Sequence, residues 1–99
     1  MKGKFNELIN KERPVLVDFY ADWCGPCQMM APVLKEVAQE MGDQVKVIKI
    51  DVDKNQPLAQ QFGVRSIPTL ILFQNGKVIS KRAGLMTKRD LLSFVKSAV

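Results

Sequence analysis

The chain has 99 residues, of which 46% are hydrophobic and 25% are charged, with two cysteines and no histidine. These proportions are typical of a globular protein, and the length predicts one domain spanning residues 1–99. No stretch approaches the roughly 18 apolar residues of a membrane helix, and the first residues lack the apolar core of a signal peptide. We therefore expect a cytoplasmic protein that binds no membrane. The net charge is +5, but the basic residues are scattered, which favours a solvated surface over a nucleic-acid site.

The first half of the chain predicts a helix, a strand, a long helix and a second strand. Residues 4–11 are polar and predict a short helix, whereas residues 15–20 are almost continuously apolar, as in a strand buried on both faces. A stripe of apolar residues with helical spacing then runs to Met41, and Gly42 is a favoured residue at a helix end. Residues 45–52 predict the second strand. A strand, a helix and a strand in this order predict a right-handed unit with two parallel strands.

The second half of the chain predicts a short helix over residues 55–62, two antiparallel strands and a final helix. The strands span residues 69–74 and 77–82, and the Asn-Gly pair between them is typical of a two-residue hairpin turn. Thr87 and Asp90 resemble a capping box that begins the last helix. Together the two halves predict an α/β sandwich around a mixed four-stranded sheet.

The two cysteines lie in one short motif, Trp23-Cys24-Gly25-Pro26-Cys27, directly after the first strand. Pro26 suits the first turn of a helix, because its missing N–H is not needed there. Cys24 is therefore expected at the N-terminal end of the long helix, where unpaired N–H groups and the helix dipole favour a thiolate. A thiolate attacks disulfides, so the motif predicts a redox-active pair.

Other interpretations of the two cysteines are weaker. Structural zinc usually takes four Cys or His ligands, and this chain offers only two, so we expect no metal within one chain. A dimer that shares four thiolates around zinc or an iron–sulfur cluster remains an alternative. A purely structural disulfide here closes a very small ring and restrains little of the unfolded chain's entropy.

Asp18 lies inside the apolar first strand, where an unpaired charge is costly and a buried carboxyl tends to bind a proton. One interpretation makes it a carboxylate that merely pairs with Lys49, which alternates with isoleucines in the second strand. The functional interpretation makes Asp18 a proton acceptor beneath the cysteine motif and near Cys27. Trp23 either fills the core or shields and presents the thiol.

The chain resembles the thioredoxin family along nearly its whole length. Five ordered segments carry the resemblance: residues 17–27, Ala31-Pro32, Ile67-Pro68-Thr69, residues 73–76 and Gly84. The resemblance implies a three-layer α/β/α sandwich whose mixed central sheet has four strands, or five with an added edge strand. It also implies a protein-disulfide reductase, a thiol-disulfide oxidoreductase that exchanges its dithiol for the disulfides of target proteins.

The resemblance implies a role for each matched residue. Cys24 is the exposed nucleophile, Cys27 is the buried resolving thiol, and Asp18 is the buried acid–base group with Lys49 as its partner. Pro68 is a cis proline facing the disulfide, although sequence pattern alone does not indicate a cis bond. An apolar docking surface is implied, formed by Trp23, Gly25, Pro26, Ile67, Pro68 and Gly84.

The implied partners are oxidised proteins and a thioredoxin reductase, and the chain carries no motif for a cofactor of its own. We expect a monomer that takes part in electron transport and cell redox homeostasis. Tyr20 stands where many thioredoxins have a second tryptophan, and Ser66 replaces a common glycine. Two alternatives remain: a thiol oxidant or isomerase on the same fold, and a non-catalytic subunit that uses only the docking surface.

Overall fold

The helices and strands follow the predicted order in the computed structural model, which describes residues 2–98. Most boundaries agree with prediction within two residues. The first helix begins earlier than expected, and the strand predicted over residues 45–52 is shortened at both ends. Residue Val99, which follows the last helix, lies outside the described residues. The elements are α1 (Lys2–Ile9), β1 (Val15–Tyr20), α2 (Gly25–Met41), a 3-10 turn (Gly42–Gln44), β2 (Lys46–Asp51), α3 (Gln56–Gln61), β3 (Thr69–Gln74), β4 (Lys77–Ala83) and α4 (Lys88–Lys96).

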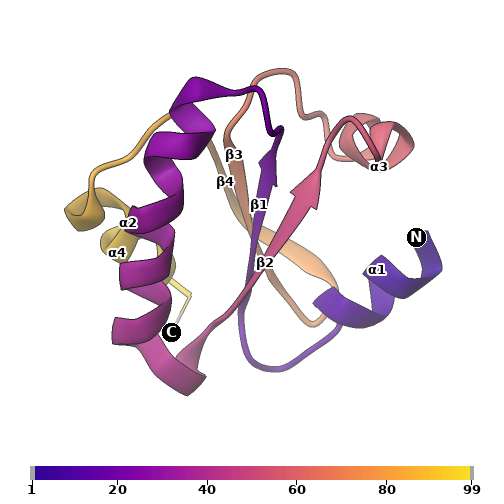
Figure 1. The fold of residues 1–99 in the computed structure, drawn as a ribbon. Coiled ribbons are helices and arrows are strands. Elements are labelled where there is room, and N and C mark those ends of the chain that lie inside the picture. Colours follow the sequence, from indigo (N-terminus) through magenta and orange to yellow (C-terminus); the bar gives the residue numbers. More distant parts are fainter. Residues whose placement is uncertain (1, 99) are drawn as a thin grey trace.

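The four strands form one mixed sheet in the order β2-β1-β3-β4. β1 pairs in parallel with β2 and antiparallel with β3, and β3 pairs antiparallel with β4. Helices α2 and α4 cover one face of the sheet, and α1 and α3 lie on the other side (Figure 1). The predicted three-layer sandwich with four strands is confirmed, and residues 2–98 contain no fifth strand.

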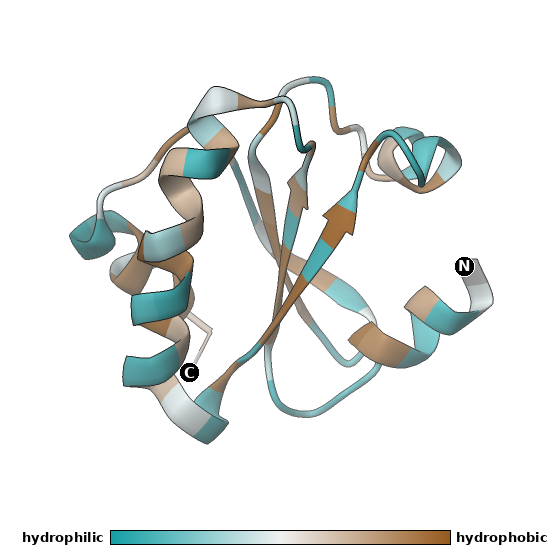
Figure 2. Ribbon diagram, in the orientation of Figure 1, coloured by the Kyte–Doolittle hydropathy of each residue, from teal (hydrophilic) through white to brown (hydrophobic). Residues whose placement is uncertain are grey.

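The alternation of side chains along β1 explains how both helical layers are held. Leu16 packs into the core beneath α2 and α4, whereas Val15, Val17 and Phe19 pack into the core beneath α1 and α3. All four are fully buried. Hydrophobic residues accordingly run along the strands, and hydrophilic residues dominate the outward sides of the helices (Figure 2). β1 therefore contributes side chains to the hydrophobic cores on both faces of the sheet, as its continuous apolar sequence predicts.

Helix α2 begins and ends where its sequence predicts. Cys24 is the N-cap, with extended backbone angles, and Pro26 lies in the first turn. At the other end, Gly42 has a φ of +55°, a conformation that costs glycine little. The 17 residues between form one helix that continues through Pro32. No helix among the described residues is long and apolar enough to cross a bilayer.

Helix α4 depends on its N-cap. The hydroxyl of Thr87 accepts a hydrogen bond from the backbone N–H of Asp90 at 3.1 Å. We expect Thr87→Ala to lower the free energy of unfolding by about 1 kcal/mol, because this N–H loses its partner. Urea denaturation at pH 7 measures the change. Ser93→Ala, on an exposed position of the same helix, is the matched control, and equal losses in the two variants would contradict a capping role.

Candidate active site

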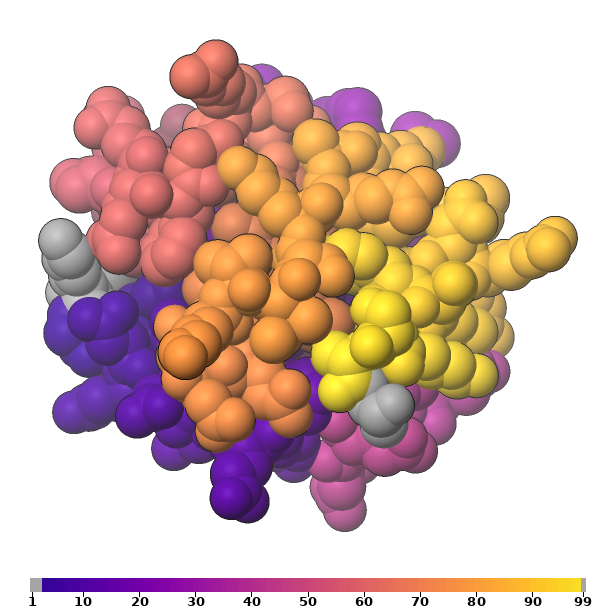
Figure 3. Space-filling model, turned by 180° about the vertical axis from the view of Figure 1, so that it is seen from behind, coloured from indigo at the N-terminus to yellow at the C-terminus, as the bar shows by residue number. Residues whose placement is uncertain are grey.

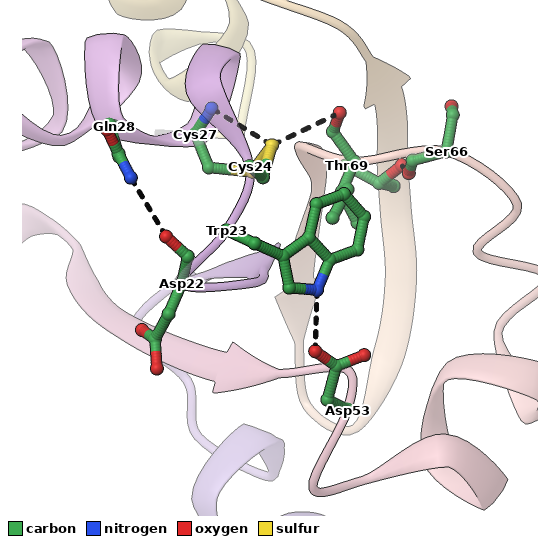
Figure 4. Close-up of a disulfide and its surroundings, with 9 residues drawn as sticks. Asp22, Trp23, Cys24, Cys27, Gln28, Asp53, Ser66 and Thr69 are labelled. Atoms are coloured by element: carbon green, nitrogen blue, oxygen red, sulfur yellow. Dashed lines mark hydrogen bonds between the residues drawn. A yellow bond between two sulfur atoms is a disulfide. The ribbon is translucent and has the colours of Figure 1, made fainter.

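The cysteine pair lies where β1 leads into α2. Cys24 and Cys27 form a disulfide. The backbone N–H of Cys27 points at the Sγ atom of Cys24 over 3.2 Å, and the N–H of Gln28 donates to the Cys24 carbonyl at 3.1 Å. Cys24 thus holds the N-cap with its sulfur in the place of the usual oxygen acceptor (Figure 4). When the disulfide is reduced, this N–H and the helix dipole stabilise negative charge on Cys24.

The expectation that Cys24 is exposed while Cys27 is buried is wrong for the disulfide form. Cys24 is 3% exposed and Cys27 is 4% exposed, so both are buried. Position on the helix, rather than exposure, distinguishes the two sulfurs here, because only Cys24 occupies the N-cap.

The loop before β3 lies against the sulfur of Cys24. The Ile67–Pro68 peptide bond is cis, which confirms the expectation drawn from family resemblance. The Sγ atom of Cys24 lies 3.8 Å from the carbonyl oxygen of Ile67. The carbonyl of Pro68 in turn accepts the N–H of Gly84 at 2.9 Å, which brings the end of β4 to the same place. Three segments that are distant in sequence therefore meet at Cys24.

Trp23 does not fill the core, because its side chain is 70% exposed. Its indole N–H donates to a carboxylate oxygen of Asp53 at 2.7 Å, and this bond fixes the direction of the ring (Figure 4). Sequence analysis missed Asp53. One signal could have found it: Asp53 follows β2, Trp23 follows β1, and the ends of parallel neighbouring strands lie together.

The other predicted docking residues gather around the disulfide with different exposures. Gly25 and Pro26 are exposed, Ile67 and Gly84 are half-buried, and Pro68 is buried. A hollow of about 190 Å³ opens beside them, lined by Trp23, Val52, Val64, Arg65, Ser66 and Ile67. This apolar recess with one guanidinium at its rim gives an approaching polypeptide a place for a side chain next to Cys24.

Asp18 is buried within β1, with 1% of its surface exposed. Its Oδ1 atom has no hydrogen-bond partner among the described residues. Burial raises the pKa of Asp18 from 3.8 to about 6, although the positive charge of Lys49 acts in the opposite direction. The raised pKa agrees with what the apolar strand predicts, and it allows the carboxyl to exchange a proton near neutral pH.

Lys49 is opposite Asp18 in the register of β1 and β2, as predicted. Its ammonium group, however, lies 4.4 Å from the centroid of the Tyr20 ring. No ion pair joins it to Asp18 in the part of the chain that the structure describes, where the ion pairs belong to Lys88. The expected partnership is therefore a charge effect at a distance. Tyr20 holds the ammonium by a cation–π contact.

A second hollow reaches the inner cysteine from the β2 side of the site. It measures about 120 Å³, and Tyr20, Cys27 and Lys49 are among the residues that line it. Asp18 itself does not line it. Solvent can thus approach Cys27 and the ammonium of Lys49 without passing the docking residues.

A disulfide at the N-cap of a helix, a cis proline beside it and a buried carboxyl in the strand that leads into it define a thiol–disulfide exchange site on an α/β sandwich. Comparisons with known proteins agree. The thioredoxin family model matches residues 1–97. The chain is 48% identical over 92 residues to a thioredoxin of Haemophilus influenzae, a match that covers 93% of this chain and 86% of that protein. It is 45% identical over 98 residues to the chloroplastic thioredoxin Y of rice, covering 98% and 58%.

Solved structures give the same answer. Oxidised mitochondrial thioredoxin 3 of Saccharomyces cerevisiae superposes with a TM-score of 0.89 at 35% identity, over 97% of this chain and 89% of that one. A mutant thioredoxin of Halobacterium salinarum gives 0.88 at 42% identity, over 97% and 83%. The chain belongs to the thioredoxin family. It is a thiol-disulfide oxidoreductase that works by dithiol–disulfide exchange, with protein disulfides as substrates and a reductase as the regenerating partner in general.

The raised pKa of Asp18 predicts a pH-dependent stability. The unfolded chain binds fewer protons than the folded one between the two pKa values, 3.8 and about 6, so stability falls as pH rises through this range. Each pKa unit corresponds to about 1.4 kcal/mol. We expect Asp18→Asn, which cannot ionise, to raise the free energy of unfolding at pH 7 by up to about 3 kcal/mol. The gain should shrink toward zero near pH 4.

Urea denaturation of the oxidised protein at pH 4 and pH 7 measures this difference. Asp43→Asn, on an exposed carboxyl in the 3-10 turn, is the matched control and should show no such pH-dependent gain. A stability gain for Asp18→Asn that is equal at both pH values would mean that ionisation of Asp18 does not oppose folding.

Proposed function

We propose that residues 1–99 form one domain that acts as a general protein-disulfide reductase, with Cys24 as the attacking sulfur. The observation that carries the proposal is the N-cap geometry, in which the backbone N–H of Cys27 points at the sulfur of Cys24. An N–H aimed at the sulfur and the positive end of the helix dipole favour loss of the thiol proton. The resulting thiolate is the reactive form. Cys27, one turn further along α2, is the resolving thiol.

The substrate binds as an extended segment across the docking surface. Exposed Trp23 and the half-buried Ile67 give this segment apolar contacts on both sides of Cys24. The Ile67 carbonyl, only 3.8 Å from the sulfur, accepts a backbone N–H from the substrate. Such a bond aligns a substrate disulfide with Cys24 whatever its side chains are, which suits a reductase with many targets.

The first chemical step forms a mixed disulfide. The thiolate of Cys24 attacks one sulfur of the substrate disulfide, and the other substrate sulfur leaves as a thiolate that takes a proton from solvent. The Cys24 sulfur is then bonded to the substrate. This step uses the dithiol form of the protein.

The second step releases the substrate. Asp18 accepts the proton of Cys27, and the resulting thiolate attacks the sulfur of Cys24, so that the remaining substrate sulfur leaves reduced. A carboxyl with a pKa of about 6 is a better acceptor at neutral pH than an ordinary aspartate. Lys49 limits the rise of that pKa and thus keeps the acceptor ionised. Two electrons have passed to the substrate, and Cys24 and Cys27 are again a disulfide.

Regeneration requires two electrons from another protein. The sequence contains no motif for a nucleotide or flavin, so we propose that a thioredoxin reductase supplies them and that the protein carries electrons between proteins. We further propose a monomer in the cytoplasm. The placement of both cysteines in one redox motif supports a reducing compartment, because structural disulfides are rare there.

The division of roles between the cysteines is tested with two matched variants. Cys27→Ser keeps the attacking sulfur but cannot resolve the mixed disulfide, so we expect it to accumulate covalent adducts with insulin. Cys24→Ser should accumulate few, because its remaining sulfur does not hold the N-cap. Non-reducing electrophoresis and mass spectrometry of the adducts distinguish the two. Adducts formed mainly by Cys24→Ser would reverse the assigned roles, and full cellular function of Cys24→Ser would favour a non-catalytic subunit.

The direction of electron flow is tested by the reduction potential. For a reductase we expect a reduction potential of about −270 mV, as in thioredoxins in general. Strong oxidants on this fold have a reduction potential of about −120 mV. Equilibration with glutathione buffers, followed by alkylation and mass spectrometry, gives the value. A potential in the oxidant range, together with poor insulin reduction in the presence of dithiothreitol, would replace the reductase by an oxidant or isomerase.

A further inference from the structure

The outer side of β2 is an unpaired strand edge. β2 pairs only with β1, in a regular parallel register with no bulge. The N–H groups of Lys46 and Val52 donate to carbonyls on the β1 side. By alternation, Val47 and Lys49 direct their N–H and C=O groups away from β1. No strand within residues 2–98 pairs with this side, although it stands at the front of the sheet between α2 and α1 (Figure 1).

The edge is closed at one end and open in its middle. The carbonyl of Asp51 accepts a hydrogen bond from the side chain of Asn55 at 3.0 Å, which ends the edge near the active site. Within residues 2–98, no strand pairs with the outward backbone groups of Val47 and Lys49. An extended chain that pairs here gains main-chain hydrogen bonds without displacing any that the fold already uses.

A hollow of about 190 Å³ lies between this edge and α2. It is lined by Ala31, Leu34 and Ala38 on the helix and by Val47 on the strand, with Lys35 and Lys49 completing the wall. A strand added to β2 turns alternate side chains toward this same face of the sheet. One apolar side chain of such a strand can therefore be buried in the hollow.

Two ammonium groups stand on the α2 side of the edge. Lys35 and Lys49 line the hollow, are exposed, and form no ion pair with another described residue. Lys46 alternates with Val47 and therefore lies on the other face of the sheet. Acidic side chains that an added strand turns toward the hollow would complement Lys35 and Lys49. A second copy of the chain is a poor occupant, because antiparallel pairing of two β2 edges would place four ammonium groups, Lys35 and Lys49 of each copy, on one face of the seam.

The opposite edge of the sheet is protected differently. β4 has a shift in its pairing with β3 between Leu72 and Phe73, and such bulges discourage further pairing. Lys81 on β4 is fixed by hydrogen bonds to the carbonyls of Phe62 and Gly63 at 2.8 and 2.9 Å. β4 forms part of the rear surface together with α4 (Figure 3). β2 has neither device.

We propose that the outer edge of β2 binds an extended acidic segment of a partner protein, which joins the sheet as a fifth strand and inserts an apolar side chain beside α2. None of the docking residues around Cys24 takes part. A partner held on this edge thus leaves Cys24 free to react with a disulfide, and the edge is a tethering site separate from the substrate site.

The test uses the oxidised protein and a synthetic peptide, acetyl-Thr-Glu-Thr-Val-Thr-Glu-Thr-amide, in which glutamates flank one apolar residue on the same face. Amide hydrogen exchange followed by NMR should show at least tenfold slower exchange at Val47 and Lys49 when the peptide is added. The amides of Ile48 and Ile50 already face β1 and should change little. A peptide with lysines in place of the glutamates is the ligand control and should bind at least tenfold more weakly.

Charge reversal tests the same edge from the protein side. Lys35→Glu should weaken peptide binding at least tenfold, because it reverses a charge that lines the hollow. Lys96→Glu changes the net charge equally on α4 and should leave binding unchanged. Both variants should reduce insulin at the parent rate.

Three results would overturn the proposal. The first is peptide-induced protection that falls on β4, α4 or the docking residues instead of Val47 and Lys49. The second is equal loss of binding in Lys35→Glu and Lys96→Glu. The third is protection of Val47 and Lys49 that depends on protein concentration without peptide, since a second copy would then occupy the edge.

Discussion

The burial of β1 on both faces is the constraint on which the rest of the structure depends. Its side chains belong alternately to the two cores, so neither helical layer can shift without disturbing the other. The strand also has a neighbour on each side, and the segments that follow β2 and precede β3 lie at the end of β1. These segments supply Asp53 and the Ile67–Pro68 bond. The site is thus assembled from loops that are positioned by the most buried strand of the molecule.

Burial of β1 also raises the pKa of the Asp18 carboxyl, and burying that carboxyl lowers the stability of the fold. Asp18 is the only charged residue of β1, and its Oδ1 atom has no hydrogen-bond partner among the described residues. A carboxylate in such a place destabilises the fold, and an apolar residue of similar size would remove that cost. What the buried position gives is a pKa of about 6, which a solvated aspartate does not have. Lys49 acts from a distance without pairing, so the carboxyl is neither neutralised by contact nor fully protonated.

Sequence patterns predict those features that depend on local order or burial. The apolar run of β1 predicts its place in the sheet, Pro26 and the cysteine spacing predict the start of α2, and the polar residue in an apolar strand predicts a perturbed carboxyl. The cis bond at Pro68 could be expected only from family resemblance, because local sequence does not set it. The bond from Trp23 to Asp53 joins residues 30 positions apart, and only the pairing of β1 with β2, whose ends these residues follow, indicates that they meet. The burial of Cys24 in the disulfide form depends on tertiary contacts that local sequence does not indicate.

The two edges of the sheet link stability to function in different ways. β4 is blunted by a bulge, whereas β2 remains regular, and its Lys49 lines both the hollow beside α2 and the hollow that reaches Cys27. A charged group bound next to Lys49 at this edge therefore changes the electrostatic effect that Lys49 has on Asp18. A carboxylate placed there offsets the positive charge of Lys49, and the pKa of Asp18 then rises, because that charge is what lowers it. The outer edge of β2 and the buried carboxyl of β1 are thus linked by a single ammonium group, that of Lys49.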